Sequence, residues 1–319
     1  MSKVVCIGES LIDFMPTGEE LTFVAKAGGA PSNVCACIAK LGGTGCYLGK
    51  LGEDIFSRFL LKNMQKWGVN TDYTIIDNRY QTALAFVSLD ENGDREFNFY
   101  RKQSCDLMLD KTEIPQDILK QGDILHFCSV GLVESPSKYA HIKAIELAKV
   151  NNCIVSFDVN VRERLWDSVD NCVKTIKEFL TYADIVKVTD EELLLLTCEK
   201  NERKAINMIF DIANNAKLVV LTKGSAGAIV YDRSGNNYFS KAADVKVVDT
   251  TGAGDCFIGC LLYKMNCGEV SLTVDGIKDA MDFASLGCGV VIGKKGAIES
   301  MPTINDIETL KKLGKKLYV

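Results

Sequence analysis

Short apolar runs alternate with helix-like segments along most of the chain. The runs lie at 4–8, 45–48, 73–76, 124–128, 154–158, 185–188 and 218–222. Segments such as 30–41 and 55–67 carry the mixed apolar and polar pattern of helices. Continuous apolar strands separated by helices are typical of a parallel sheet that helices cover on both faces. The pattern therefore predicts an α/β fold with a mainly parallel sheet.

Two strand-like runs, 82–89 and 95–101, depart from this alternation. The connection between them, 90–94, reads D-E-N-G-D and is typical of a hairpin turn. A hairpin inserted into an α/β protein predicts a lid, although an extension at the edge of the main sheet would have the same pattern. No repeat, low-complexity tract or Pro/Gly linker marks a boundary, so we expect one domain, 1–319, with an inserted lid.

The composition of the chain argues against several classes of protein. The chain has 319 residues, and its 37 basic and 42 acidic side chains give a formal charge of −5, which argues against a nucleic-acid binder. It has 13 cysteines, an odd number, without any C-x-x-C spacing, and residues 1–16 carry acids where a secretory leader needs apolar residues. Reduced, buried thiols in a cytoplasmic protein are the expectation. No apolar stretch reaches the length of a membrane span, so we expect a soluble protein.

The segment 249–257, D-T-T-G-A-G-D-C-F, is the most informative part of the sequence. It precedes an apolar, helix-compatible run at 258–265. Glycines at the start of a helix let the backbone approach a ligand, and the unpaired N–H groups there bind anions. In phosphoryl transfer these groups would meet the charge of the moving phosphate, while Asp255 takes the proton of the attacking hydroxyl. A simple helix cap is the alternative interpretation of Asp255.

Other catalytic patterns fit poorly. No G-x-x-x-x-G-K-[ST] occurs, since 45–50 is only superficially similar to it, and no G-x-G-x-x-G follows the first strand. The two histidines, His126 and His141, stand in no nucleophile or metal arrangement. His126 lies in an apolar run and is expected in the core.

The segment 249–257 resembles the signature of the ribokinase-like carbohydrate kinases, also called the PfkB family. Three further stretches match that family in the expected order: G-G-A-P-S-N-V at 28–34, T-K-G-S-A-G at 222–227, and Gly296-Ala297 before Pro302. The similarity covers residues 3–302. It implies a ribokinase-like three-layer α/β fold with a mainly parallel central sheet flanked by helices. It also implies a small inserted β-lid made by segments at approximately 10–30 and 80–105.

The resemblance also implies roles for individual residues. The catalytic base and the anion hole before it correspond to Asp255, Gly252, Ala253 and Gly254. The positions that hold or surround the sugar correspond to Asp13, Gly28, Gly29, Asn33, Arg101, Asp106 and Arg162. The positions for ATP are Thr189, Thr222, Lys223, Gly224 and Gly227, with Gly254 shared. The adenine pocket is expected between the Lys223 turn and the segment 284–289.

Several of these positions also have a purely structural interpretation. Asp13 suits a turn or cap, Gly28-Gly29 an ordinary turn, and Arg101 a solvated strand end. Arg162 suits a salt bridge to a structural carboxylate. Each alternative stays open on the sequence alone.

Magnesium is expected with ATP, held chiefly by phosphates and waters. Glu192 corresponds to the acid of the family's N-x-x-E element, acting through water, and Asp158 to a position near the magnesium network. Thr189 stands where asparagine is usual, and T-x-x-E at 189–192 also predicts a capping box. The positions implied for a monovalent cation such as K⁺ are Asp249, Thr251, Gly296 and Ser300.

The segments 97–106 and 158–162 resemble the fructokinase branch of the family. The resemblance therefore implies ATP-dependent phosphorylation of a primary hydroxyl, fructose to fructose 6-phosphate, with the sugar and ATP as small-molecule partners. A 2-keto-3-deoxygluconate kinase, a ribokinase and a catalytically silent sugar or nucleotide sensor are the alternatives. No nucleic-acid or membrane partner is expected. Lid-mediated homodimers are frequent in the families that the chain resembles, so a homodimer is a further expectation.

Overall fold

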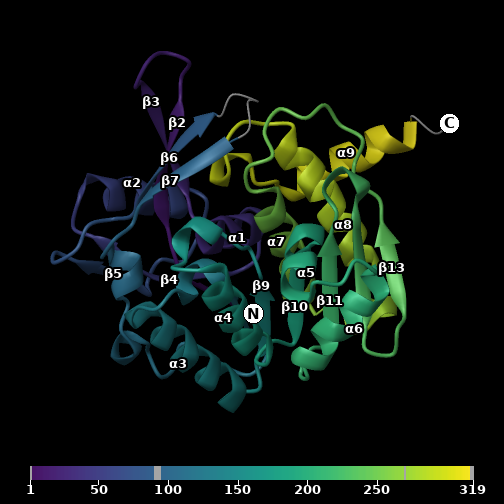
Figure 1. Cartoon of the computed structure of the whole chain (residues 1–319). Helices are drawn as coiled ribbons and strands as arrows, with labels where there is room; N and C mark the ends of the chain where they lie inside the picture. The colour runs from purple at the N-terminus through teal and green to yellow at the C-terminus, as the bar shows by residue number, and fades with distance from the viewer. Residues whose placement is uncertain (1, 90–94, 269–270, 317–319) are drawn as a thin grey trace.

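The computed structural model describes residues 2–89, 95–268 and 271–316 (Figure 1). The predicted turn at 90–94 lies outside these residues. Within them, nine strands form a main sheet in the order β13-β12-β11-β10-β9-β8-β1-β4-β5. These strands are β1 (Val4–Ile7), β4 (Gly45–Gly52), β5 (Thr74–Asp77), β8 (Ile124–Cys128), β9 (Ile154–Asp158), β10 (Ile185–Thr189), β11 (Leu218–Thr222), β12 (Ala228–Asp232) and β13 (Asn237–Ser240).

The main sheet is parallel from β5 to β11, and β12 and β13 extend it antiparallel. Every residue of β1, β4 and β8 is buried. Burial on both faces explains why parallel strands of this kind have almost unbroken apolar sequences. The predicted mainly parallel sheet is confirmed. The antiparallel edge has no such signal, because exposed and buried positions mix along β13.

Helices cover both faces of the main sheet and give the predicted three layers (Figure 1). The helices α3 (Pro136–Val150), α4 (Val169–Leu180), α5 (Asp190–Thr197) and α6 (Glu202–Ile212) pack on one face. The helices α1 (Ala30–Lys40), α2 (Ile55–Lys66), α7 (Ala253–Asn266), α8 (Val274–Ile292) and α9 (Ile304–Lys316) pack on the other. In the part of the chain that the structure describes, no helix is long and apolar enough to cross a membrane.

The predicted lid is a second sheet of four described strands, in the order β3-β2-β6-β7. These strands are β2 (Leu11–Pro16), β3 (Phe23–Gly28), β6 (Leu84–Leu89) and β7 (Arg95–Tyr100), and they lie within the two predicted lid segments. The hairpin β6–β7 pairs with β2 rather than with the main sheet, so an edge extension of the main sheet is the wrong interpretation. Half-buried residues in β2 and β3 leave no continuous apolar run to predict them as strands.

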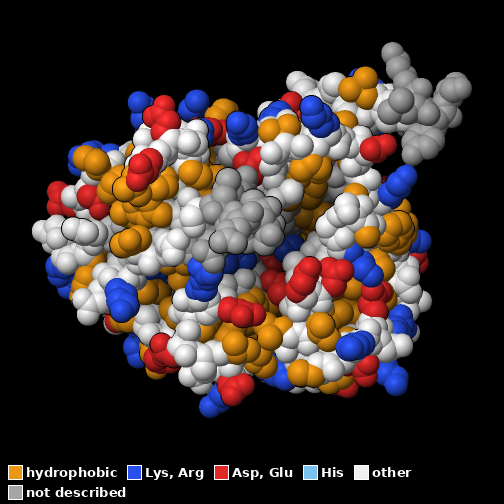
Figure 2. All heavy atoms as spheres, turned by 45° about the horizontal axis from the view of Figure 1, so that its top comes forward, with side chains coloured by type: hydrophobic (Ala, Val, Ile, Leu, Met, Phe, Trp, Pro, Cys, Tyr) orange, Lys and Arg blue, Asp and Glu red, His pale blue; other side chains and the backbone are white. Residues whose placement is uncertain are grey.

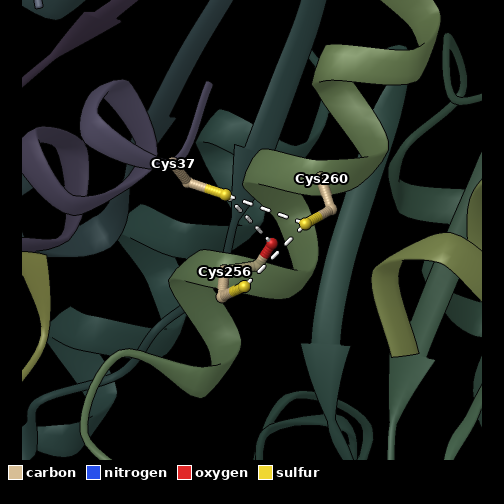
Figure 3. Close-up of side chains that lie close together, drawn as sticks. All are labelled: Cys37, Cys256 and Cys260. Carbon is tan, nitrogen blue, oxygen red and sulfur yellow. Dashed lines mark hydrogen bonds between the residues drawn. The ribbon is translucent and has the colours of Figure 1, made fainter. Parts of the chain in front are cut away.

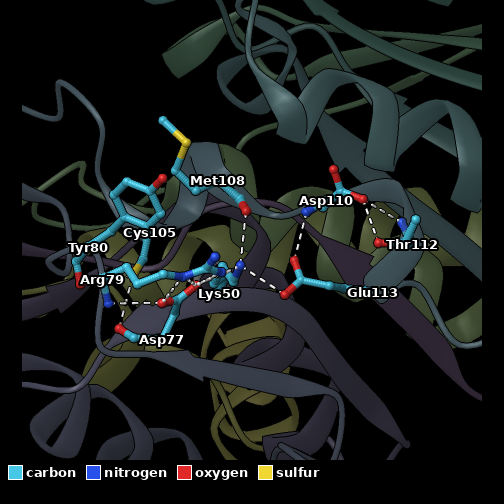
Figure 4. Close-up of polar contacts among 9 residues, drawn as sticks. All are labelled: Lys50, Asp77, Arg79, Tyr80, Cys105, Met108, Asp110, Thr112 and Glu113. Carbon is cyan, nitrogen blue, oxygen red and sulfur yellow. Dashed lines mark hydrogen bonds and ion pairs between the residues drawn. The ribbon is translucent and has the colours of Figure 1, made fainter.

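A buried ion-pair network holds β4 against the segment that follows the lid (Figure 4). Lys50 Nζ lies 2.9 Å from both Asp77 Oδ2 and Glu113 Oε1, and it donates to the Met108 carbonyl at 3.0 Å. Only 2% of the Lys50 side chain is exposed. The similarity of 45–50 to a phosphate-binding loop is therefore superficial, because these residues form β4 and Lys50 has structural partners.

The interior also agrees with the predictions for cysteine and histidine. Every cysteine has a free thiol, and most are buried. His126 is buried beside Ser156, 3.1 Å from its hydroxyl, and burial lowers its pKa to about 4. The predicted core position of His126 is confirmed.

Candidate active site

A cavity of about 430 Å³ lies between the carboxyl ends of the main-sheet strands and the lid sheet. Ligands of parallel α/β sheets gather at this edge. Figure 2 shows this end of the molecule, with acidic and basic side chains around the hollow. The predicted site residues that line the cavity are Asp13, Gly29, Asn33, Asp158, Arg162, Thr189, Glu192, Thr251, Gly252, Ala253, Gly254 and Asp255.

The first turn of α7 forms one wall of the cavity. Gly252 is the N-cap residue and has a φ of 78°, a conformation that favours glycine. Asp255 is the third residue of the helix rather than its N-cap, and its carboxylate is hydrogen-bonded to Asn33, so an N-cap is the wrong interpretation of Asp255. The open helix start places backbone N–H groups and the positive end of the helix dipole beside the cavity, an arrangement that suits an anion.

The side chain of Asp255 accepts a hydrogen bond from a residue that is far away in the sequence. Asn33 Nδ2, on α1, donates to Asp255 Oδ2 at 2.7 Å. Burial raises the pKa of Asp255 to about 6, even though the hydrogen bond from Asn33 lowers it; the charge of Asp158 raises it further, and those of Lys187 and Arg162 lower it. A carboxylate with a pKa near 6 suits proton abstraction near neutral pH.

Lys187 is the main functional candidate that the sequence analysis missed. Its Nζ lies 2.8 Å and 2.9 Å from the two carboxylate oxygens of Asp158, and it also lines the cavity. A Cβ added to Gly254 would lie 3.3 Å from the same Nζ. Burial alone would lower the pKa of Lys187, but Asp158 and Glu192 together raise it. The cavity therefore has a fixed positive charge next to the α7 helix start.

Glu192 and Thr189 form the predicted capping box of α5. Thr189 N donates to Glu192 Oε2 at 2.9 Å, and Glu192 N donates to Thr189 Oγ1 at 3.2 Å. Glu192 Oε1 also accepts from Val161 N at 2.8 Å. With both oxygens already hydrogen-bonded, Glu192 suits a contact to magnesium through water better than direct ligation.

Asp13 lies inside strand β2, so a turn or cap is the wrong interpretation of it. Side chains alternate along a strand, and Leu11 and Asp13 therefore line the cavity from the same face of the lid. A Cβ on Gly28 would lie 2.0 Å from Asp13 Oδ2, so a side chain there would displace the Asp13 carboxylate. Gly29, with a φ of 106°, brings the backbone to the cavity wall at the start of α1.

Glu9 is a second cavity residue that the sequence analysis missed. Its Oε1 accepts a hydrogen bond from Ala30 N at 3.1 Å, next to Gly29. Burial raises the pKa of Glu9 to about 7, against the lowering effect of Arg101. Glu9 comes just after the first strand, where ligands of α/β sheets gather, and this position could have predicted a role in the site. Only Asp13 was predicted from that segment.

Arg101 and Asp106 lie behind the cavity wall. They form a buried ion pair of 2.5 Å, and Arg101 Nη1 donates to the Val130 carbonyl at 2.9 Å. Ser104 Oγ donates to Asp106 Oδ1 at 2.5 Å. A solvated strand end is therefore the wrong interpretation of Arg101. Neither residue lines the cavity, whereas Val130 does.

Arg162 is exposed and lines the cavity, in the loop that follows β9. Its Nη1 donates to the carbonyl of the neighbouring Val161 at 2.8 Å. Its positive charge is one of the influences that lower the pKa of Asp255. It is positioned to contact an anion entering the cavity.

The predicted nucleotide turn follows β11. Thr222 pairs in register with Thr189, which lines the cavity, so the turn begins beside the cavity edge. Lys223 Nζ lies 2.5 Å from Glu202 Oε2. A Cβ on Gly227 would lie 2.4 Å from the Ser240 carbonyl, so Gly227 has a packing role. Thr222, Lys223, Gly224 and Gly227 do not line the cavity, and their contact with ATP stays a prediction.

The four residues predicted for a monovalent cation lie together. Asp249 Oδ1 accepts from Thr251 N at 2.8 Å, and Asp249 Oδ2 accepts from Gly296 N at 3.1 Å. Ser300 Oγ donates to the Gly296 carbonyl. This loop cluster adjoins the α7 helix start, where a Cβ on Gly252 would lie 3.1 Å from Ala297 Cβ.

Comparison with known proteins agrees with this geometry. Residues 1–304 match the model of the family described as pfkB family carbohydrate kinase. The chain is 37% identical over 316 residues to a probable fructokinase-5 of Arabidopsis thaliana, covering 97% of each protein. A crystal structure of fructokinase from Vibrio cholerae O395 with fructose, ADP and calcium ion bound has a TM-score of 0.90 and 32% identity, covering 97% of this chain and 99% of that one. A fructokinase from Xylella fastidiosa with bound ATP has a TM-score of 0.89 and 30% identity, covering 98% and 99%.

Proposed function

The chain belongs to the pfkB family of carbohydrate kinases, and from this premise we propose that it transfers the γ-phosphoryl group of ATP to a primary hydroxyl of fructose, giving fructose 6-phosphate. The observation that carries the proposal is the position of Asp255. It lies in the first turn of an uncapped helix, inside a cavity that also contains the lid residue Asp13. Fructose and ADP in the related Vibrio cholerae structure support this choice of substrates.

Asp255 acts as the base in this proposal. Its carboxylate accepts the proton of the attacking sugar hydroxyl as the bond to phosphorus forms. Asn33 fixes the orientation of the carboxylate through the 2.7 Å hydrogen bond to Oδ2, which leaves Oδ1 for the hydroxyl. Burial keeps water from solvating the carboxylate and raises its pKa to about 6. Asp255 is therefore ionised at neutral pH while its basicity stays above that of an exposed aspartate.

The charge on the transferred phosphoryl group needs fixed donors, because phosphoryl transfer is catalysed mainly by positioning and electrostatics. The backbone N–H groups of Gly252, Ala253 and Gly254 supply them at the α7 helix start. Lys187 adds a full positive charge, held in place by Asp158. Arg162 contacts the same anionic groups from the loop that follows β9.

The sugar is held between the lid and the start of α1. Asp13 accepts hydrogen bonds from sugar hydroxyls, Asn33 contacts the sugar as well as the base, and Gly29 lets the backbone approach the ring. Glu9 supports the Gly29-Ala30 backbone through its hydrogen bond to Ala30 N. Closing the lid over the sugar excludes water, which limits wasteful hydrolysis of ATP.

ATP binds along the carboxyl ends of β10 and β11, with Thr189 at the phosphates and the turn 222–227 under the nucleotide. The oxygens of Asp158 and Glu192 already accept hydrogen bonds from Lys187, Val161 and Thr189, so they fit a Mg²⁺ ion held through water. When bound, magnesium neutralises the β- and γ-phosphates. The loop cluster of Asp249, Thr251, Gly296 and Ser300 supplies the oxygens for a K⁺ ion.

A panel of acceptors tests the proposed substrate. ATP consumption with magnesium is measured with fructose, ribose, 2-keto-3-deoxygluconate, adenosine and no acceptor. Turnover that depends on fructose, with at least a tenfold preference in kcat/KM over the other acceptors, is the expected result. Turnover with ribose or 2-keto-3-deoxygluconate instead overturns the choice of sugar and retains the kinase. Binding of ATP and fructose without any turnover identifies a silent sensor and overturns the proposed reaction.

A second copy of the chain covers the outer face of the lid. The aromatic rings of Phe14, Phe23, Phe86 and Tyr100 contact one another on that face. Tyr100, on the same face, is 67% exposed. Figure 2, with the lid turned forward, shows apolar side chains gathered on its surface. Exposed apolar patches of this kind favour association, which supports a homodimer formed through the lid.

A further inference from the structure

Three cysteine thiols form a compact cluster behind the candidate active site. Cys37 comes from α1, whereas Cys256 and Cys260 lie one turn apart on α7, and Figure 3 shows their sulfur atoms turned toward one another. The Sγ–Sγ distances are 3.7 Å between Cys37 and Cys260 and 3.8 Å between Cys256 and Cys260. All three sulfurs lie within 4.8 Å of one another, and all three residues are 0% exposed.

Tight backbone packing keeps these sulfurs in place. A Cβ added to Gly259 on α7 would lie 2.9 Å from Cys37 Sγ. A Cβ added to Gly287 on α8 would lie 2.6 Å from Cys260 Sγ. Glycine at both positions therefore leaves room for the thiols between α1, α7 and α8. The cluster is preorganised rather than formed by side chains that would have to converge from solvent.

The cluster offers three sulfur ligands, and sulfur is a soft ligand. Thiolates select Cu(I), zinc and iron–sulfur centres, whereas oxygen ligands select harder ions. A planar three-sulfur site with metal–sulfur bonds of about 2.3 Å needs sulfurs about 4 Å apart, close to the observed separations. Zinc needs four ligands. Cys288 contacts Cys256, but it is not a member of the group whose sulfurs all lie within 4.8 Å of one another, and its Sγ donates to the Ala253 carbonyl at 3.2 Å.

We propose that Cys37, Cys256 and Cys260 form a three-coordinate binding site for Cu(I). Each thiol exchanges its S–H bond for a Cu–S bond, the protons pass to solvent, and copper keeps its oxidation state. Lys40 lies three residues after Cys37 on α1, and its positive charge offsets part of the negative charge of the thiolates.

The three cysteines lie next to the residues that form the candidate active site. Cys37 lies one turn after Asn33 on α1, and Cys256 directly follows Asp255 on α7. A bound ion therefore joins the two helices next to the 2.7 Å hydrogen bond between Asn33 and Asp255. Because the sulfurs already have about the required spacing, the bound ion leaves the distance between the two helices unchanged. This inference does not depend on the identity of the sugar substrate.

The direct test loads the full chain with one equivalent of Cu(I) under anaerobic conditions, in the presence of a competing Cu(I) chelator. X-ray absorption of the wild-type complex is expected to show three sulfur scatterers at about 2.3 Å. Two scatterers, or complete loss of copper to the chelator, would overturn the site. This measurement needs no substitution, so it remains decisive even when a core variant folds poorly.

A matched pair of variants locates the ion. Cys260→Ala is expected to weaken Cu(I) binding at least a hundredfold, whereas Cys267→Ala, which removes an exposed thiol just beyond the end of the same helix, leaves it unchanged. Equal binding by both variants would place the copper elsewhere and overturn the proposal. A parallel titration with Zn²⁺ that showed tighter binding by four sulfurs would overturn the three-coordinate assignment.

Discussion

Asp255 combines a basic carboxylate with a position at the positive end of a helix, and these two properties oppose each other. A helix N-terminus and nearby cations stabilise a carboxylate, whereas burial and the neighbouring charge of Asp158 destabilise it. The balance raises the pKa to about 6, and the hydrogen bond from Asn33 limits the rise. Burial and the hydrogen bond both change the fraction of Asp255 that is ionised, so the pH dependence of activity should reveal them.

The pH dependence of kcat/KM is expected to follow the protonation of Asp255. A protonated carboxylic acid cannot accept the hydroxyl proton, so activity should be lost as pH falls through about 6 and should reach a plateau above pH 7. Initial rates with saturating ATP from pH 5 to pH 8.5 measure this limb. The exposed-site variant Asp211→Asn is the control and should keep the same profile. An apparent pKa near 4 would contradict the assignment.

Substitution of Asn33 should move this limb in a defined direction. Asn33→Ala removes the hydrogen bond that lowers the pKa of Asp255, so the acidic limb should shift to higher pH. Loss of carboxylate orientation should lower kcat about tenfold, and loss of a sugar contact should raise the KM for the sugar. Asn207→Ala, an exposed change on α6, serves as the control. A limb that stays in place or moves to lower pH would show that Asn33 does not act on the base.

At the level of helices and strands, continuous apolar runs were the reliable signal. The runs at 124–128, 154–158 and 218–222 coincide with β8, β9 and β11. The strands β3 and β13 contain exposed or half-buried positions and have no such runs, so the sequence did not predict them. The Lys187–Asp158 pair depends on the register of β10 against β9, which the sequence does not specify without the sheet order.

The buried pair of Arg101 and Asp106 joins the end of lid strand β7 to the cavity wall at Val130. Asp106→Asn removes the negative charge and leaves the buried guanidinium without compensation, which should cost about 3–5 kcal/mol of folding stability. Denaturant unfolding measures the change. Asp275→Asn breaks the exposed pair with Lys278 and should leave stability unchanged. Equal stability of the two variants would show that the buried pair does not anchor the lid.

At the scale of the whole molecule, the candidate site depends on bringing distant parts of the chain together. Asp13 comes from the lid, Asp158 from the middle of the main sheet and Asp255 from the start of α7. The ordered motifs identify most of these positions through their resemblance to a family. They do not identify Glu9 and Lys187, whose roles depend on burial and on partners that only the folded chain supplies.

Association through the lid is testable by sedimentation velocity. The wild-type protein is expected to sediment as a dimer at micromolar concentration. Tyr100→Asp places a charge in the apolar lid face and should give a monomer. Val150→Asp changes an apolar residue that is 79% exposed at the end of α3, remote from the lid, and should leave the dimer intact. A wild-type monomer, or a dimer that Tyr100→Asp does not affect, would contradict this assembly.

Fructose-dependent ATP turnover by Asp255→Asn, compared with the wild-type protein, tests the central claim most directly. The amide keeps the size of the side chain but cannot accept the hydroxyl proton, so kcat should fall by about three orders of magnitude or more. Calorimetry should show that fructose and ATP still bind within a few-fold of their wild-type affinities. Turnover within tenfold of the wild-type rate would show that Asp255 is not the base and would contradict the proposed mechanism.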